Sequence, residues 1–273
     1  MRNWKISPKD SIVAAYIDCY WFLEKTADDD GPEFPKLNPD PAGHLILANS
    51  LQPYHYQSET YTDQGLGSHF ILPHSKTLLM DHSQPFLVVG IKFHVGALYS
   101  LNLPSSELEI ERILGINSKE LLSINANRVM ANSPWSPEEF RDNFDKQLTP
   151  LISTAHSDSH SELVSKIVST FSNTPLSGIG IALSCSQRTI ERSFLRVTGF
   201  TLKQYDSMQK LERLLDYVHK LDNSQLEWAD IAFQFGFSDQ PHLVRYLKNV
   251  IGSTPGKYAQ LRDLAIDAYG NFE

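Results

Sequence analysis

The chain has 273 residues, a formal net charge of −8 at pH 7 and 41% hydrophobic residues. That length suits two domains of ordinary size, each large enough to bury its own core. The first residues lack the apolar core of a secretory signal, and no segment approaches the roughly 20 apolar residues that span a bilayer. We therefore expect a cytoplasmic protein with no membrane segment.

Charge is divided unevenly along the chain. Residues 161–260 hold 11 Lys+Arg and 9 Asp+Glu, a net charge of +2, whereas residues 1–160 hold 12 Lys+Arg and 20 Asp+Glu, a net charge of −8. A nucleic-acid partner attracts a protein mainly through its phosphates. If DNA is the partner, the acidic first part should face away from it. The small positive excess then predicts dependence on specific contacts or on dimerisation.

The first part of the chain predicts a β-rich domain. Short apolar or alternating runs are separated by Pro, Gly, Asn or Asp, which is typical of strands joined by turns. Six such runs favour an antiparallel sheet or a small barrel. They are the second half of residues 11–24 and the runs 44–48, 54–57, 68–72, 77–80 and 86–93.

Helical patterns follow the last of these runs. Residues 95–102 and 121–130 predict short helices, and Ser136-Pro-Glu-Glu139 is a capping box that opens a helix reaching about Leu151. The polar run 153–161 predicts a linker. The expected fold class is α+β in two domains: an antiparallel β domain with helices over residues 1–155, then an all-α domain over residues 161–262.

Histidines in the first domain raise the question of a metal site, because imidazoles on neighbouring strands can ligate Fe, Mn or Zn. The close His-x-His pair with a following Glu that such a site normally uses is missing, and Cys19 and Cys185 lie in different predicted domains. No phosphate loop or nucleophile elbow is visible. We expect no metal, no cofactor and no catalytic residue. The histidines are His44, His55, His69, His74, His82 and His94.

Aromatic side chains on the predicted strands are a second candidate feature of this domain. Their rings could line an apolar pocket with polar tips, although aromatic residues on strands more often form core. No ligand-binding residue is singled out on this basis. The residues are Tyr16, Tyr20, Trp21, Tyr54, Tyr56, Tyr61, Phe70 and Phe93.

The pattern of residues 184–255 predicts two helix-turn-helix units joined by a long helix. In the first unit, Ser186 and Gly199 are start and stop signals, and Ile190, Phe194 and Val197 recur at helical spacing. This spacing places the apolar side chains on one face, directed towards a core.

Arginines occupy another face of the same predicted helix. Arg188, Arg192 and Arg196 fall four residues apart, about 6 Å per step, which suits a row of donors directed into a DNA groove. Glu191 lies beside them and can accept from cytosine, or it pairs with a neighbouring arginine. The alternative for the whole stripe is a solvated face. The presence of a second unit favours DNA contact.

The second unit repeats this arrangement. Residues 231–238 predict a short helix that ends at Gly236, followed by Ser238 as the cap of a second recognition helix with Pro241 in its first turn. Leu243 and Leu247 point inward on that helix. The outward-facing residues are Gln240, His242 and Arg245, with Lys248 near the end to meet phosphate.

These motifs resemble those of a known family. Gly236-Phe-Ser-Asp-Gln-Pro-His-Leu243, Arg245 and Gly252-Ser-Thr-Pro-Gly-Lys-Tyr258 resemble the signature of the AraC/XylS transcription regulators, and residues 186–199 match that family's first recognition helix. The resemblance implies an all-helical DNA-binding domain whose recognition helices enter successive major-groove segments about 34 Å apart. It places the base-reading positions at Arg188, Glu191, Arg192, Gln240, His242 and Arg245.

The sequence departs from this family pattern at a few positions. The resemblance places the linker helix within residues 202–221 and a support helix at residues 176–183, which contains Gly178 and Gly180. Each interior glycine costs up to about 1 kcal/mol of helix stability. Ser184 stands where glycine is common, and Leu247 where phenylalanine is usual.

The first half resembles the cupin-like amino-terminal domains of AraC-type regulators, through residues 16–22, 38–47 and 90–97. We therefore expect a sequence-specific DNA-binding transcription regulator that is not an enzyme. Its partners would be double-stranded promoter DNA and RNA polymerase, with a small-molecule effector or a homodimer controlling it. Two alternatives stay open: a metal-dependent cupin enzyme fused to a DNA-binding module, and a regulator whose β domain binds no ligand and only mediates interaction.

Overall fold

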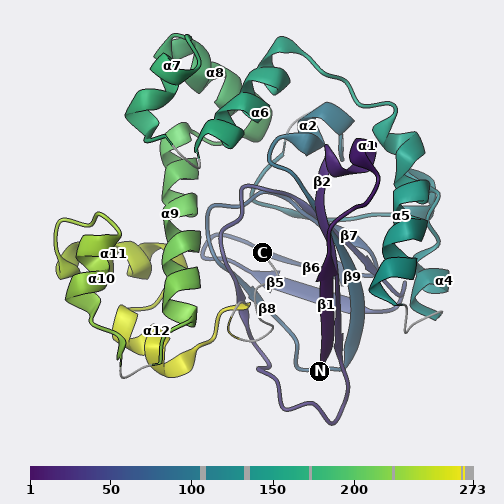
Figure 1. Cartoon of the computed structure of the whole chain (residues 1–273). Coiled ribbons are helices and arrows are strands. Elements are labelled where there is room, and N and C mark those ends of the chain that lie inside the picture. Colours follow the sequence, from purple (N-terminus) through teal and green to yellow (C-terminus); the bar gives the residue numbers. More distant parts are fainter. Residues whose placement is uncertain (105–108, 132–135, 172–173, 223–224, 266, 268–273) are drawn as a thin grey trace.

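The computed structural model describes residues 1–273 except 105–108, 132–135, 172–173, 223–224, 266 and 268–273, and places a β-rich part beside a group of helices (Figure 1). The strands are β1 (Arg2–Ile6), β2 (Ile17–Lys25), β3 (Lys36–Leu37), β4 (His44–Ala48), β5 (Pro53–Gln57), β6 (Thr62–Leu66), β7 (His69–Ile71), β8 (Leu78–Met80), β9 (Phe86–Phe93) and β10 (Ile113–Gly115). The helices of the β-rich part are α1 (Ser11–Ala14), α2 (Ala97–Leu101), α3 (Ser118–Leu122), α4 (Ala126–Ala131) and α5 (Pro137–Ile152). The C-terminal part contains α6 (Ser159–Phe171), the 3₁₀ turn η1 (Leu176–Gly178), α7 (Ile179–Ala182), α8 (Gln187–Thr198), α9 (Leu202–His219), α10 (Trp228–Gln234), α11 (Gln240–Ile251) and α12 (Pro255–Leu261).

Two antiparallel sheets make up the N-terminal part. The larger sheet has the order β1-β2-β9-β4-β7-β10 and the smaller sheet the order β3-β8-β5-β6. One buried cluster joins side chains of both sheets, among them Ile46 and Ile71 of the larger sheet and Leu78 and Met80 of the smaller one. An antiparallel β domain with helices is therefore confirmed.

Helix α5 covers the other face of the larger sheet. Its Phe140, Phe144 and Leu148 are fully buried against Tyr20 and Phe22 of β2. The Tyr20 hydroxyl donates to Asp145 Oδ1 of α5 at 2.7 Å, so that a buried phenol and a buried carboxylate satisfy each other. The larger sheet is thus buried on both faces, which explains the long apolar runs of β2, β4 and β9.

All six predicted runs contain strands, namely β2, β4, β5, β7, β8 and β9. The four strands that the sequence did not predict are β1, β10, β3 and β6, and these are the four edge strands of the two sheets. An edge strand is paired on one side only and is commonly more exposed and polar. In β6 the burial alternates between exposed and half-buried positions, so it lacks the apolar run that marks an interior strand.

Two helix predictions are corrected by the structure. The single helix expected over residues 121–130 is wrong, because Ser123 adopts a left-handed φ of 57° that ends α3 before α4 begins. The support helix expected over residues 176–183 is a 3₁₀ turn followed by the four residues of α7. Among the described helices, none combines the length and apolar character needed to cross a membrane.

Helix α9 joins two helical units. Tyr205 and Met208 in its first half pack into the core formed by α6, α7 and α8, whereas Leu211, Leu215 and Val218 in its second half pack with α10, α11 and α12. We call these groups of helices the first unit and the second unit. Figure 1 shows α9 running between them.

Candidate nucleic-acid interface

Helix α8 begins and ends at the residues that the sequence predicted. The Ser186 hydroxyl accepts from the Thr189 amide at 3.2 Å, and Gly199 closes the helix in a left-handed conformation with a φ of 77°. Ile190, Phe194 and Val197 are buried, as expected. Their burial leaves the opposite face exposed, and that face carries Arg188, Glu191, Arg192 and Arg196.

Neighbouring helices fix the orientation of α8. The ring of Phe194 lies 5.1 Å from that of Tyr205 on α9, and Ser193 Oγ is hydrogen-bonded to His160 Nδ1 of α6 at 2.9 Å. Ser193 is itself buried. These contacts hold the inward face of α8, so the exposed arginine face has a defined direction.

Helix α11 has a different cap from the expected one. Asp239, not Ser238, is the N-cap, and its Oδ1 accepts from the His242 amide at 2.6 Å. Both residue types cap helices well, and Asp239 has the extended backbone that is usual at an N-cap. Pro241 lies in the first turn, as predicted. Leu243 and Leu247 are fully buried, and the exposed positions are Gln240, His242, Arg245 and Lys248.

Contacts from α9 fix the turn and helix of the second unit. Gly236 has a left-handed φ of 69°, and its carbonyl accepts from Lys210 Nζ at 3.2 Å. The same ammonium lies 3.6 Å from the centre of the Phe237 ring. Farther along, the Tyr246 hydroxyl donates to the Ser207 carbonyl at 2.6 Å. Sequence reasoning missed Lys210 and Tyr246, because neither partner lies nearby in the chain.

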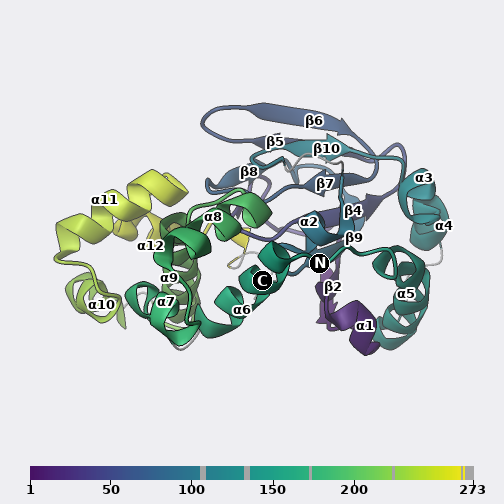
Figure 2. The same ribbon diagram turned by 90° about the horizontal axis from the view of Figure 1, so that it is seen from above.

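The two candidate recognition helices lie on the same side of the connecting helix. Seen along α9 in Figure 2, α8 and α11 are on one side of it, and α7 and α10 are on the other. All eight side chains that the sequence proposed for DNA contact are exposed. The arrangement therefore presents two polar helix faces from one scaffold, as a double helix-turn-helix requires.

Three of the eight side chains are hydrogen-bonded to other side chains among the described residues. Glu191 accepts from Gln187 Nε2 at 2.9 Å, one helical turn away, instead of pairing with an arginine. His242 Nδ1 lies 3.1 Å from the Ser238 hydroxyl. Arg196 Nε donates to the Tyr99 hydroxyl of α2 at 3.2 Å, and this bond raises the pKa of the guanidinium. Within the described part of the chain, Arg196 is thus the one proposed DNA contact that is bonded to the N-terminal part.

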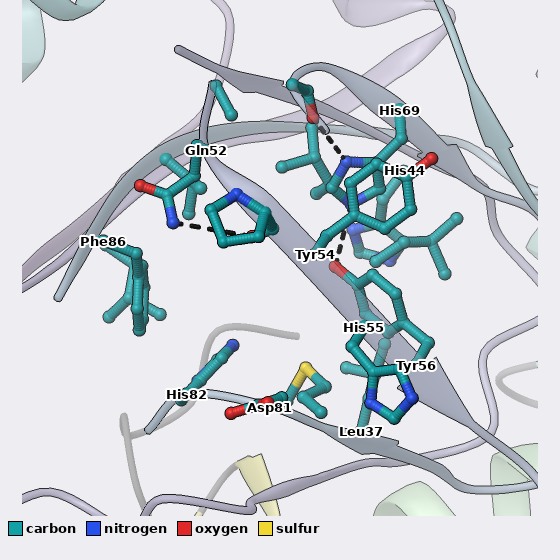
Figure 3. A pocket seen from close by; sticks show the side chains of 18 of the residues that line it. Leu37, His44, Gln52, Tyr54, His55, Tyr56, His69, Asp81, His82 and Phe86 are labelled. Carbon is teal, nitrogen blue, oxygen red and sulfur yellow. Dashed lines mark hydrogen bonds between the residues drawn. The ribbon is translucent and has the colours of Figure 1, made fainter. Parts of the chain in front are cut away.

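A cavity of about 150 Å³ lies between the two sheets of the N-terminal part (Figure 3). Trp21, Tyr54 and Tyr56 from the aromatic set of the sequence line it, whereas Tyr20, Phe70 and Phe93 belong to the core on the other side of the larger sheet. Tyr16 packs against that core, and Tyr61 packs against the cluster between the sheets.

Four of the six histidines named above, His44, His55, His69 and His82, line this cavity. His69 is buried, with Nδ1 2.9 Å from the Gly67 carbonyl and Nε2 2.9 Å from the Tyr56 hydroxyl. Burial lowers the pKa of His69 to about 4, and burial together with the charge of Lys25 lowers the pKa of His82 to about 4. In the described part of the chain, no group of three His, Cys, Asp or Glu residues is placed to hold a metal ion.

A buried ion cluster connects this cavity to the helical units. Asp40 Oδ2 lies 2.9 Å from His44 Nε2 and 2.9 Å from Lys92 Nζ. Burial alone would raise the pKa of Asp40, but Lys92 and the bond from His44 bring it well below its ordinary value. Asp40 and Lys92 line a second cavity of about 120 Å³, whose other wall includes Gln209 and Glu212 of α9. Burial raises the pKa of Glu212.

Models of two protein families match the two parts of the chain. Residues 180–261 match a family described as a helix-turn-helix domain, and residues 5–113 match a domain of unknown function, DUF6597. No curated protein matches the chain. Among solved structures, ToxT from Vibrio cholerae O395 is 12% identical, with 94% of this chain and 95% of that chain covered and a TM-score of 0.45.

Two further structures are more distant. The AraC-like transcriptional activator CuxR is 12% identical, with 79% of this chain and 86% of that chain covered and a TM-score of 0.29. A cupin 2 domain-containing protein from Halorhodospira halophila is also 12% identical, with 50% of this chain and 83% of that chain covered and a TM-score of 0.23. The assignment of the C-terminal helices accordingly rests on the family match and on the geometry of the two units.

Proposed function

We infer that this chain, a DNA-binding transcription regulator with an AraC-type helix-turn-helix domain at its C-terminal end, contacts promoter DNA through α8 and α11 in adjacent segments of the major groove. The observation that carries the inference is the pair of exposed polar faces on α8 and α11, both on one side of α9. Phosphate contacts would set the register, and base-edge contacts would supply sequence specificity.

The proposed DNA-contacting residues differ in the DNA groups that their side chains can bind. An arginine side chain bonds guanine O6 and N7 with two donors, and a glutamine bonds adenine in the same way. We propose such contacts for the exposed Arg188 and Arg192 on α8 and for the exposed Gln240 and Arg245 on α11. Lys248 near the end of α11 suits phosphate. We also propose base contacts for Glu191 and His242, whose bonds are to residues four positions away, whereas Arg196 must first exchange its bond to Tyr99.

The N-terminal part would control this domain and is proposed to have no catalytic role. In the described chain it contacts both units, because Tyr99 of α2 bonds α8 and the Thr77 hydroxyl donates to the Val250 carbonyl of α11 at 2.7 Å. It also contains a cavity of about 150 Å³ between its sheets. We therefore propose a sensor for a small-molecule effector acting in the cytoplasm. RNA polymerase and a second copy of the chain are further expected partners.

The proposal is tested by substituting one arginine on each helix and measuring affinity for the native promoter. Arg192→Ala and Arg245→Ala should each weaken binding at least fivefold and relax base preference at one position, since a good bidentate pair contributes about 1 to 3 kcal/mol of discrimination. Arg128→Ala, at an exposed position on α4, is the matched control and should leave affinity unchanged. Wild-type affinity and base preference in both test variants would refute the assignment.

The metal-dependent enzyme alternative has its own test. Elemental analysis of the purified protein should find no stoichiometric Fe, Mn, Ni or Zn. A stoichiometric metal would contradict the proposed role of the N-terminal part.

A further inference from the structure

The cavity between the sheets has walls of mixed chemistry. Figure 3 shows Gln52, Phe86 and His82 on one side of the hollow and Tyr54, His55 and Tyr56 on the other. Aliphatic side chains of both sheets, with Trp21, form much of the remaining surface. A few polar tips among aromatic and aliphatic side chains are typical of a small-molecule site, where the apolar surface supplies affinity and the polar groups fix orientation.

Glycines make room for two of the aromatic walls. Trp21 lies opposite Gly90 in the β2–β9 ladder, and a Cβ on Gly90 would meet the indole at 1.8 Å. Tyr54 lies over Gly65, where a Cβ would come within 2.4 Å of its hydroxyl oxygen. Both close approaches require the absence of a side chain on the neighbouring strand. The glycines on the neighbouring strands therefore allow these two rings to lie close against the sheets.

The charge of the cavity excludes one class of ligand. None of the described residues that line it is a lysine or an arginine, and Asp81 contributes a carboxylate whose pKa is lowered by hydrogen bonds from Ser83. His69 and His82, with pKa values of about 4, are neutral at pH 7. The imidazole of His44 is held against Asp40, which also pairs with Lys92. An anion entering this cavity would lose its hydration without meeting a lysine or arginine among the described residues of its walls, because the nearby Lys25 ammonium is bonded to the carbonyls of Gly31 and His82.

The C-terminal segment after α12 forms part of the same wall. Leu264 is fully buried in the core of the second unit, and the next residue, Ala265, lines the cavity. The segment is held on β3, where the Lys36 amide donates to the Asp263 carbonyl at 2.9 Å and Lys36 Nζ lies 2.6 Å from Asp263 Oδ2. Leu264 thus belongs to the core of the second unit, and the residue that follows it belongs to the wall of the cavity.

We propose that this cavity binds an uncharged, largely apolar, ring-containing molecule with a hydrogen-bonding group, and that Ala265 contacts the bound molecule directly. The proposal deepens the sensor role inferred above and rests on it. It implies that the occupant touches the helical half of the protein without an intermediate residue. A larger occupant would press on the segment that follows α12.

Two dyes with the same ring system test the ligand class in the full-length protein. N-phenyl-1-naphthylamine is uncharged, and 8-anilinonaphthalene-1-sulfonate adds a sulfonate. In fluorescence titrations we expect saturable binding of the neutral dye with one site per chain, and at least tenfold weaker binding of the sulfonate. Equal affinities, or preference for the sulfonate, would overturn the proposed ligand class.

Substitution of Ala265 tests the wall. Ala265→Phe should weaken binding of the neutral dye at least tenfold. Ala265→Met places a smaller and more flexible side chain there and should weaken binding at least threefold. Ala131→Phe, at an exposed position on α4, should stay within twofold of wild type. Thermal melting followed by circular dichroism shows whether each variant folds. If Ala265→Phe does not fold, the dye affinity of Ala265→Met tests the contact. Wild-type dye affinity in a folded Ala265 variant would refute the contact.

The outcome is separable from that of the proposed function. Dye binding is measured without DNA, and Arg192→Ala and Arg245→Ala should bind the dye as wild type does. Failure of the dye experiments while those arginine variants lose DNA binding would remove the ligand proposal alone. Normal dye binding with unimpaired DNA binding in the arginine variants would remove the DNA assignment alone.

Discussion

At the scale of single residues, His69 shows how burial and hydrogen bonding select one protonation state. A neutral ring donates from Nδ1 to the Gly67 carbonyl and accepts at Nε2 from the Tyr56 hydroxyl, which satisfies both nitrogens inside the protein. A second proton would require the buried ring to carry a charge. The pKa of His69 accordingly falls from 6.5 to about 4.

This depressed pKa makes a prediction about stability. Below pH 6.5 the unfolded chain takes up a proton at His69 that the folded protein refuses, so the free energy of unfolding should fall as the pH drops towards 4. The contribution of this residue is about 3 kcal/mol. Urea unfolding at pH 7 and pH 4 gives the decrease in the free energy of unfolding between the two pH values. This decrease should be smaller for His69→Gln than for wild type, whereas His94→Gln, at an exposed position, should show the wild-type decrease. Equal losses in all three proteins would contradict it.

At the scale of elements, the turns before the two recognition helices use different residues for one backbone conformation. Gly236 has a φ of 69° and Ser184 has a φ of 50°. A left-handed conformation costs an L-residue roughly 1 to 2 kcal/mol, whereas glycine adopts it readily. The first unit therefore contains a strained residue at a position where the second unit has none.

Substitutions at Ser184 and Gly236 should change the stability of the protein in opposite directions. Ser184→Gly should raise the free energy of unfolding by about 0.5 to 1 kcal/mol, and Gly236→Ala should lower it by about 1 kcal/mol. The second effect would be conformational, because a Cβ on Gly236 meets only Lys210 Nζ, at 4.0 Å. Ser169→Gly, within α6, is the control for the same substitution in an ordinary helical conformation. It should lower the free energy of unfolding by about 0.5 to 1 kcal/mol. Calorimetry of the three variants checks the signs, and destabilisation by Ser184→Gly would contradict the account.

The elements that could be predicted from the sequence are those that local residues define. Helix α8 has its cap, its stop and its apolar stripe within residues 186–199, and the prediction was correct at both ends. The edge strands lack such local signals, and the cavity combines separate strands with Ala265 near the end of the chain. The bond between Arg196 and Tyr99 joins residues 97 positions apart. Spacing along the chain predicts a helix face, but it carries no information about a partner at that distance.

At the scale of the whole molecule, the two sheets contact different units. The first unit meets α2, which follows β9 of the larger sheet, through Tyr99 and Arg196. The second unit meets the smaller sheet through the segment on β3 and through Lys76, whose Nζ donates to the Asn249 carbonyl at 3.0 Å. The cavity lies between the sheets, so its walls belong to two sheets that are connected to different units.

Loosening the segment on β3 should expose the end of α12. The Lys36–Asp263 pair is partly exposed and contributes up to about 1 kcal/mol, equivalent to about a fivefold change in local opening. Lys36→Met should therefore speed tryptic cleavage after Arg262 at least twofold, as quantified by mass spectrometry. Lys119→Met, at an exposed position on α3, should leave the rate unchanged. An unchanged rate in Lys36→Met would show that this pair does not hold the segment.

The central claim is that α8 and α11 contact one face of the same DNA duplex. Methylation interference at guanine N7 on the native promoter tests it most directly, because this atom lies in the major groove. The account predicts two interfering segments about 10 base pairs apart, of which Arg192→Ala removes one and Arg245→Ala the other. A single segment, or two segments half a helical turn out of phase, would contradict it.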